Sequence, residues 1–182
     1  MAIDPQYAGN WMIDAAHSRI GFSTRHAMIA RVRGAFNEVS GEVHLNPESF
    51  DQSTVRVVIR AASIDTREAD RDNHIRSADF LDVEQFPEIT FVSNSIDEIS
   101  DENFIVAGEL TIRGITRPVS VPLELLGIES DPSGALRAGL EGTRRIDRRD
   151  WGVTWNTPLD SGGMLVSDKI TLEFELSLVK QQ

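Results

Sequence analysis

Every second side chain is apolar over long stretches of this chain, and this alternation constrains the fold more than any other feature. Between Ile170 and Leu178, for example, Ile, Leu, Phe, Leu and Leu alternate with Thr, Glu, Glu and Ser. Successive side chains of an extended strand point to opposite faces, so a period of two gives one apolar and one polar face. The pattern is typical of an all-β protein whose sheet has one solvent-exposed face and one buried face.

The alternation predicts eight strands. They cover residues 20–28, 32–45, 55–61, 89–91, 104–112, 119–125, 136–142 and 170–178. The second is expected to be one long, curved strand with a bulge near Asn37 and Glu38, because the apolar parity changes there. The rhythm stops after the third strand, where Asp65 and Glu68 have capping-box spacing and residues 66–79 predict a helix.

Eight antiparallel strands, with one helix inserted between strands three and four, allow a sandwich or a closed barrel. An eight-stranded barrel is just wide enough inside for side chains or for one slender ligand. Five glycines fall on the apolar parity, at positions 34, 41, 108, 127 and 142. They either leave the interior open or only ease the curvature of the strands, and the sequence does not decide between these interpretations.

The length of the chain limits the number of domains, and its charge limits the kinds of binding partner. The 182 residues contain no linker, so we expect one domain, 1–182. Lysine and arginine number 18 against 29 aspartate and glutamate, and this net charge of −11 predicts repulsion from nucleic acids and anionic membranes. No run approaches the roughly 20 apolar residues of a transmembrane helix, and no signal peptide is visible. We therefore expect a cytoplasmic protein, or a periplasmic or secreted one if a leader was removed.

Short motifs occur in a fixed order along the chain. They are Trp11, Ile13-Asp14, His17-Ser18, Phe22, His26, Gly34, Phe36, Arg71-Asp72, His74, Asp79-Phe80-Leu81-Asp82, Phe86-Pro87, Ile89, Phe91, Gly108, Leu110-Thr111-Ile112, Gly114 to Pro118, Arg148 to Gly152, Trp155 and Ser167-Asp168. No single motif is specific, but the ordered set resembles the YceI-like family. The resemblance implies a lipocalin-like barrel, partly closed by a helix, that takes up a polyisoprenoid, an isoprenoid quinone or another long amphiphile. It also implies a binding protein for storage or transport, with no enzymatic activity.

Candidate ligand-binding residues follow from the inward parity and from this resemblance. They are Phe22, His26, Phe36, Phe91, Phe104, Leu110, Ile112, Leu123, Leu140, Trp155 and Phe174. Each is equally typical of a filled core. The candidates for contact with a polar head group are His17, Arg71, His74 and Arg148, and structural pairing at the barrel rim is the alternative for the charged ones. The four histidines are too scattered for a linear metal motif, so neither a metal nor a cofactor is expected.

Two other functions stay open. A ligand-free interaction module could act through the acidic surface in a stress response. A hydrolase could use Asp14, His17 and Ser18, although residues this close on an extended segment alternate faces and could not form a relay. An apolar outer strip that includes Val58 and Val92 makes a homodimer plausible.

Overall fold

The structure, a computed structural model, describes residues 3–182 and consists of one antiparallel sheet of eleven strands. The strands are β1 (Gly9–Ile13), β2 (Arg19–His26), β3 (Ala30–Phe36), β4 (Val39–Leu45), β5 (Thr54–Arg60), β6 (Ile64–Asp65), β7 (Glu88–Glu98), β8 (Asn103–Ile112), β9 (Ile115–Ser130), β10 (Leu136–Asp147) and β11 (Lys169–Lys180). The helical elements are α1 (Ala69–Arg76) and the 3₁₀ turns η1 (Pro5–Tyr7), η2 (Ala15–His17), η3 (Phe50–Gln52), η4 (Ala61–Ser63) and η5 (Arg148–Trp151). No helix in this range is long and apolar enough to cross a membrane.

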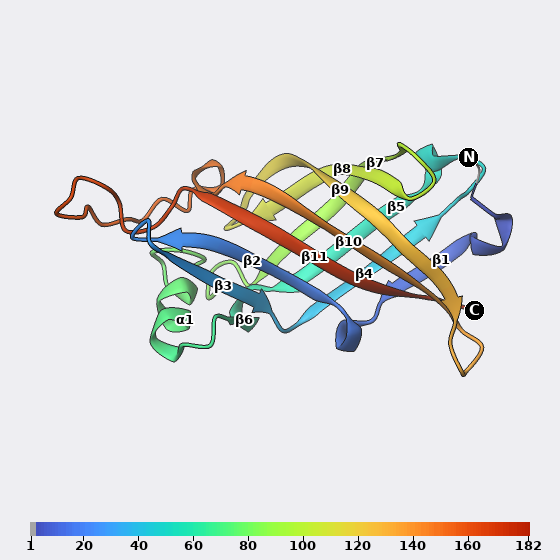
Figure 1. The fold of residues 1–182 in the computed structure, drawn as a ribbon, viewed down its shortest axis with the longest axis horizontal. Helices are drawn as coiled ribbons and strands as arrows, with labels where there is room; N and C mark the ends of the chain where they lie inside the picture. The colour runs from blue at the N-terminus through green and yellow to red at the C-terminus, as the bar shows by residue number, and fades with distance from the viewer. Residues whose placement is uncertain (1–2) are drawn as a thin grey trace.

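The sheet closes into a barrel, so the sandwich alternative is wrong. The ring runs β1-β4-β5-β7-β8-β9-β10-β11, and β11 returns to pair with β1. In that closing pair Trp11 lies opposite Lys180, and Ile13 lies opposite Leu178. All eight strands of the ring run antiparallel to their neighbours, as the alternation predicts. Figure 1 shows the long strands wrapping around an elongated barrel, with both chain ends at the same end.

Strands β1 and β2 lie in series along one edge of β11. The carboxyl end of β11 pairs with β1, and its amino-terminal part, Thr171 to Glu175, pairs with β2. Strands β3 and β6 continue the sheet beyond β2, and α1 lies beside them at the end of the barrel away from the termini (Figure 1). Strand β1 therefore completes the ring at one end of the barrel, and the β2-β3-β6 extension with its helix lies at the other end.

The predicted position and length of the helix are wrong. The helix follows β6 and precedes β7, and it covers Ala69–Arg76 instead of residues 66–79. The Glu68 carboxylate caps it by accepting a hydrogen bond from the Arg71 amide, whereas Asp65 accepts one from the Arg67 amide in the preceding turn. The helix is shorter than predicted because Asp65 caps the turn before the helix, and Glu68, three residues later, is the N-cap.

The predicted second strand, residues 32–45, is two strands. Strand β3 pairs with β2 and β6, whereas β4 pairs with β1 and β5. The parity change at Asn37 and Glu38 marks a connection and not a bulge: the Asn37 amide donates to the Ser63 carbonyl, and the Glu38 amide donates to the Ser63 hydroxyl. Strands β1 and β6 were not predicted, since they have five and two residues and carry little periodic signal.

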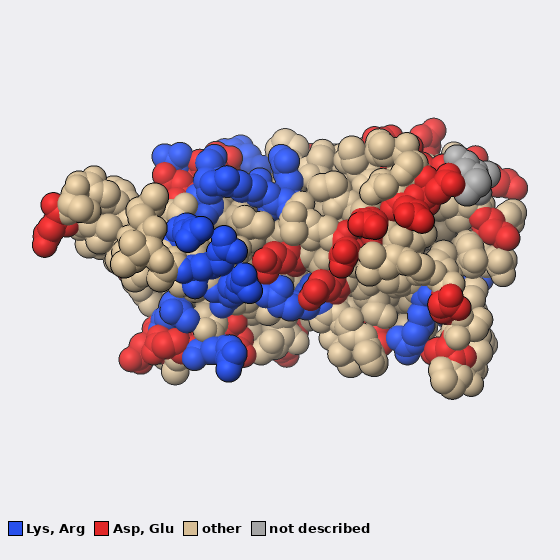
Figure 2. Space-filling view, in the orientation of Figure 1, with Lys and Arg blue, Asp and Glu red and all other residues tan. Residues whose placement is uncertain are grey.

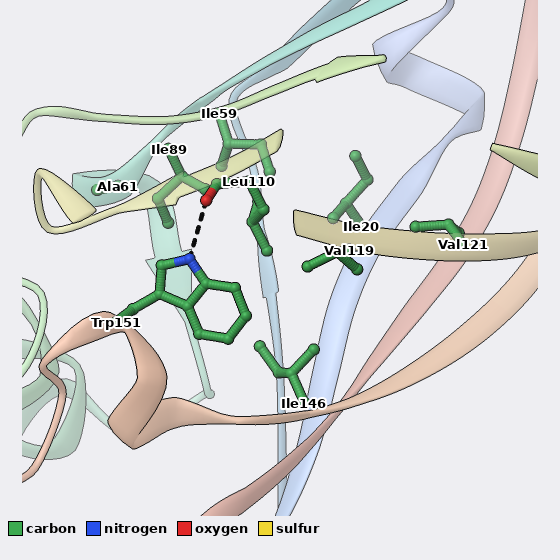
Figure 3. Packing of buried hydrophobic residues seen from close by; sticks show 9 residues of the cluster. All are labelled: Ile20, Ile59, Ala61, Ile89, Leu110, Val119, Val121, Ile146 and Trp151. Atoms are coloured by element: carbon green, nitrogen blue, oxygen red, sulfur yellow. Dashed lines mark hydrogen bonds between the residues drawn. The ribbon is translucent and has the colours of Figure 1, made fainter. Parts of the chain in front are cut away.

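The buried residues form two clusters inside the barrel. The larger one gathers aliphatic side chains around Trp151, whose indole N–H donates to the Leu110 carbonyl oxygen at 2.9 Å (Figure 3). The smaller one surrounds Trp11 at the end where β1 completes the ring, together with Ala138 and Leu178. Trp11 and Trp151 each satisfy the ring N–H with a backbone carbonyl, as a buried indole must.

Candidate functional site

The interior of the barrel contains a central cavity of about 190 Å³ to which only apolar atoms are exposed. Seven predicted ligand-binding residues line it. They are Phe22, Phe36, Phe91, Leu110, Ile112, Leu123 and Phe174. The rings of Phe22 and Phe36 lie 6.2 Å apart, centroid to centroid, and form one aromatic wall. The inward parity therefore places these side chains around a space that their own packing does not fill.

A second cavity of about 140 Å³ lies at the end where β1 completes the ring, and we name it the Trp11 cavity. The predicted residues Phe104, Leu123 and Leu140 line it, together with Trp11. Its walls are almost wholly apolar. It shares five lining residues with the central cavity: Val55, Val57, Val106, Leu123 and Leu176. The two spaces are thus neighbours separated by side chains.

A third cavity of about 220 Å³ lies at the α1 end, and we name it the mouth cavity because its lining residue His26 is exposed to solvent. Six predicted residues line it: Phe22, His26, Arg71, His74, Arg148 and Trp155. It shares Phe22, Arg148, Val153 and Ile170 with the central cavity but no residue with the Trp11 cavity. The three cavities therefore follow one another along the barrel in the order Trp11, central, mouth.

Aromatic stacking and a carboxylate fix His74 in the mouth cavity. Its ring centroid lies 4.6 Å from that of Trp155 and 4.9 Å from that of Phe80, both edge to face. The imidazole Nε2 lies 2.9 Å from the Asp79 carboxylate. Both T-shaped contacts and the polar contact restrict the ring, so His74 lines the cavity in one orientation.

Arg71 offers one free donor group to the mouth cavity. Its Nε donates to the Thr66 hydroxyl at 2.8 Å, and its Nη2 donates to the Thr66 carbonyl at 2.8 Å. The remaining Nη1 has no hydrogen-bond partner in residues 3–182. His26, at the end of β2, likewise has an imidazole without a partner in that range, while its backbone forms a bridge with Val166. These two side chains can both contact a polar group at the mouth.

Arg148 is only 5 % exposed, and its donors are committed to the protein. Nε donates to the Ser167 carbonyl at 2.9 Å, and Nη1 donates to the Val153 carbonyl at 2.7 Å. Burial lowers the pKa of this guanidinium, against the opposing effect of the Asp168 carboxylate. Only its apolar stem faces the central cavity, so the structure gives Arg148 the role of a tie between η5 and residues 153–167.

His17 does not lie with the other candidates. It contacts the Asp14 carboxylate at 2.7 Å, is exposed, and lines a surface groove with Arg137 and Asp131, outside the three cavities. The segment is not extended, as the sequence argument assumed, but forms the turn η2, which brings Asp14 and His17 together. The Ser18 hydroxyl is engaged elsewhere: it donates to the Ser177 carbonyl and accepts from the Ser177 amide. The three residues do not form a relay.

Four of the five glycines on the apolar parity do not leave empty space. A Cβ atom on Gly34 would meet the Phe22 ring at 2.7 Å, and one on Gly108 would meet the Val92 carbonyl oxygen at 2.4 Å. Added Cβ atoms at Gly41 and Gly142 would also lie within 2.5 Å of a neighbour, whereas Gly127 has no such contact within 4 Å. Four of the five glycines permit close packing of a neighbouring strand or ring, and the cavities exist despite that packing.

Some lining residues were missed. They include Ile20, Ile59, Ile89, Val119, Val121, Trp151 and Val153. The first five lie on strands and share the inward parity of their predicted neighbours, so the same pattern could have found them. Trp151 and Val153 lie in and after η5, where period-two alternation ends, and no sequence signal places them inside.

Comparisons with known proteins agree with this architecture. The family model for the YceI-like domain matches residues 11–178. A UPF0312 protein of Vibrio parahaemolyticus is 35 % identical over 148 residues, which cover 80 % of this chain and 78 % of the relative. The crystal structure of Burkholderia cenocepacia BcnA superposes with a TM-score of 0.79 at 25 % identity, over 91 % of this chain and 98 % of that one. A polyisoprenoid-binding domain from Saccharophagus degradans shares the fold, with a TM-score of 0.72 at 14 % identity over 94 % of this chain and 98 % of that one.

Proposed function

The chain belongs to the YceI-like family, and from this premise we propose that it binds a long-chain isoprenoid lipid, a polyisoprenoid or an isoprenoid quinone, inside the barrel. The series of three cavities, apolar at the Trp11 end and in the centre and with polar side chains at the mouth, carries this proposal. A compact guest needs one pocket, whereas a row of narrow spaces suits a molecule that is long and thin. The Saccharophagus domain is described as polyisoprenoid-binding, but at 14 % identity it supports the fold, so the ligand class rests on the cavity walls of this chain.

The walls explain how a lipid without charge could bind tightly. Only apolar atoms face the central cavity, and branched aliphatic and phenyl side chains make up most of its lining. Each methylene group removed from water contributes about 0.8 kcal/mol, so affinity grows with the length of chain that is enclosed. The barrel would store or carry the lipid by replacing water around its tail, which requires no chemical step.

The mouth cavity is the proposed place of the polar head. Its lining combines the apolar ring of Trp155 with the polar side chains of His26, Arg71 and His74. A few polar groups at the rim of an apolar pocket fix the orientation of a ligand. The tail would then point from the mouth cavity through the central cavity towards Trp11.

Denaturing organic extraction of the native protein, followed by mass spectrometry, tests the proposal. We expect one isoprenoid species in near-stoichiometric amount. A protein that is empty as isolated and also fails to take up added polyprenol or quinone would contradict the proposal. It would favour the ligand-free interaction module instead.

Replacing the aromatic wall should remove the lipid. In a Phe22→Asp/Phe36→Asp variant, two carboxylates enter the apolar central cavity, draw water into it and remove the enclosing rings, so nearly all extracted lipid should be lost. The matched control is Val92→Asp on β7, because this side chain is 48 % exposed and lines none of the three cavities. Circular dichroism checks that both proteins fold. A folded double variant with full lipid content would show that these residues are not the wall of the site.

A further inference from the structure

Two loop tips at the mouth end present exposed apolar side chains next to each other. Met28 and Ile29, in the turn between β2 and β3, are 68 % and 86 % exposed, and Met164 is 51 % exposed. The Ala27 amide donates to the Leu165 carbonyl at 2.6 Å, so the turn lies directly against the loop that carries Met164. Soluble monomers seldom expose a cluster of large apolar side chains without a partner for it.

Residues 156–166 are held as an ordered arm and not as a loose loop. The Asn156 side chain donates to the Val166 carbonyl at 2.7 Å and accepts from the Val166 amide at 2.9 Å. Further along, Pro158 and Met164 form an antiparallel bridge, and the Leu159 amide donates to the Gly163 carbonyl. Figure 1 shows this arm extending beyond the barrel beside the end of β2. The exposed side chains are therefore presented by fixed backbone.

A cluster of unpaired arginines lies behind these tips. They are Arg25, Arg31, Arg33 and Arg145, all exposed and without an ion pair or side-chain hydrogen bond in residues 3–182. Strand register brings them together: Arg33 lies opposite Ser23, Ser23 opposite Thr171, and Thr171 opposite Arg145. In the β2-β3 hairpin Arg25 lies directly opposite Arg31, which places two like charges in one cross-strand pair. Such a pair is unfavourable unless an anion from outside compensates it.

On the face shown in Figure 2 the charges are distributed unevenly along the molecule. Figure 2 shows Lys and Arg side chains gathered over the half of this face that carries the mouth-end segments of β2, β10 and β11, and a row of Asp and Glu side chains on the other half. At physiological ionic strength a charge is screened beyond about 8 Å, so the arginine cluster acts as a local cationic surface although the whole chain carries a net charge of −11. The net charge predicts repulsion from anionic membranes, but it does not take into account that the charges are unevenly distributed over this face.

From the apolar tips and the cationic cluster together, we infer that the mouth end docks on an anionic lipid bilayer. Met28, Ile29 and Met164 insert at the level of the headgroups, and the arginines behind them contact lipid phosphates. This combination of a small apolar contact and a basic patch is how proteins bind at membrane interfaces without spanning them. The docking surface is continuous with the mouth cavity, because Arg25, His26 and Leu165 line that cavity. A lipid could therefore pass between bilayer and barrel without crossing bulk water.

Vesicle flotation tests the docking surface. The full-length protein should float with vesicles of phosphatidylcholine and phosphatidylglycerol in equal parts, should not float with phosphatidylcholine alone, and should be released by added salt. Each Arg→Gln change, Arg31→Gln or Arg145→Gln, should weaken partitioning about fivefold, the effect of one basic residue near an anionic surface. The matched control is Lys180→Gln, since Lys180 lies at the opposite end of β11. An equal loss in the control, or no loss in both arginine variants, would refute the proposal.

Substitutions in the apolar loop tips and at the acidic residue of the arm should change membrane partitioning in opposite directions. Ile29→Ser should weaken partitioning about tenfold because it removes an inserted side chain, whereas Leu126→Ser, on an exposed residue of β9, should not. Asp160→Asn should strengthen binding, since it removes a carboxylate from the arm. If the protein instead binds duplex DNA or heparin as tightly and Ile29→Ser has no effect, the cluster recognises a soluble polyanion. Direct uptake of added polyprenol, measured without vesicles, should be unchanged in the same variants, so a docking failure is distinguishable from a failure of the proposed binding function.

Discussion

At the scale of single residues, Arg148 combines burial with three backbone contacts. Its guanidinium donates to the carbonyls of Ser167, Val153 and Val166 and lies 3.9 Å from the Asp168 carboxylate. A buried cation is costly unless its donors are satisfied. Since these carbonyls belong to the segment that lines the mouth cavity, one side chain holds much of that wall in place.

Replacement of Arg148 should therefore destabilise the protein. Arg148→Met keeps the apolar stem but removes the guanidinium donors to the Ser167 and Val153 carbonyls, and we expect a loss of about 3 kcal/mol in the free energy of unfolding. Urea denaturation measures this. The neighbouring Arg149→Met is the control, because Arg149 is 54 % exposed and pairs with Asp147 at the surface. If Arg148→Met unfolds at the same urea concentration as the control, the carbonyl contacts do not stabilise the fold.

The site residues that the sequence could predict are those on regular strands. Phe22, Phe36 and Phe91 lie where the inward parity puts them, because the side-chain period of a strand is fixed by backbone geometry. His17 lies outside the three cavities because a 3₁₀ turn, whose short sequence has no periodicity, interrupts the extended chain. Trp151 was missed for the same reason. Local turns decide which residues leave the alternating pattern, and contacts distant in sequence decide those turns.

At the scale of elements, β7 and β8 meet at a register shift between Ser93 and Ser95. Gly108 lies opposite Ser93, and a Cβ atom there would lie 2.4 Å from the Val92 carbonyl oxygen. That oxygen belongs to the backbone and cannot rotate away. The close approach of the two strands at this irregularity therefore depends on the absence of a side chain.

Alanine at this position should separate the strands. We expect Gly108→Ala to lower the free energy of unfolding by about 2 kcal/mol, since an overpacked site forces the backbone to shift. Gly127→Ala is the matched control on β9, because nothing lies within 4 Å of an added Cβ there. Thermal unfolding compares the two. Equal melting temperatures would show that β7 and β8 adjust at no cost.

The sequence predicted the elements of the barrel wall better than those of its ends. The long strands carry enough alternating residues to be recognised, whereas the two-residue strand β6 and the division between β3 and β4 are fixed by which strands they pair with. The helix was located approximately, but its start depends on which of two acidic residues caps it. In each case the missing information is a tertiary contact.

At the scale of the whole molecule, acidic residues with lowered pKa values set the response to acid. Hydrogen bonds from Arg137, and then His17, lower the pKa of Asp14 from 3.8 to about 2. Hydrogen bonds from Ser133 and Arg137 lower that of Asp131 from 3.8 to about 2. Arg149 holds the pKa of Asp147 well below its usual range. Arg137 joins η2 to the β9-β10 turn through two contacts of 2.8 Å.

Lowered carboxylate pKa values stabilise the folded state above the unfolded pKa and lose that effect as pH falls through the folded pKa. The contribution of Asp14 and Asp131 to stability should thus be fully present above about pH 5 and should be lost progressively as the pH falls to about 2 and both are protonated. Arg137→Gln removes a shared partner, so it should make this decrease shallower. Urea unfolding at a series of pH values measures the slope. An unchanged slope in Arg137→Gln would mean that other carboxylates govern the acid response.

The shared walls between the cavities have a consequence for selectivity. Phe22 and Ile170 stand between the mouth cavity and the central cavity, and Leu123 and Leu176 stand between the central cavity and the Trp11 cavity. A longer lipid can reach the next cavity only if the side chains between the two cavities rotate. The barrel would then select lipids by chain length in discrete steps, and one pair of side chains would set each step.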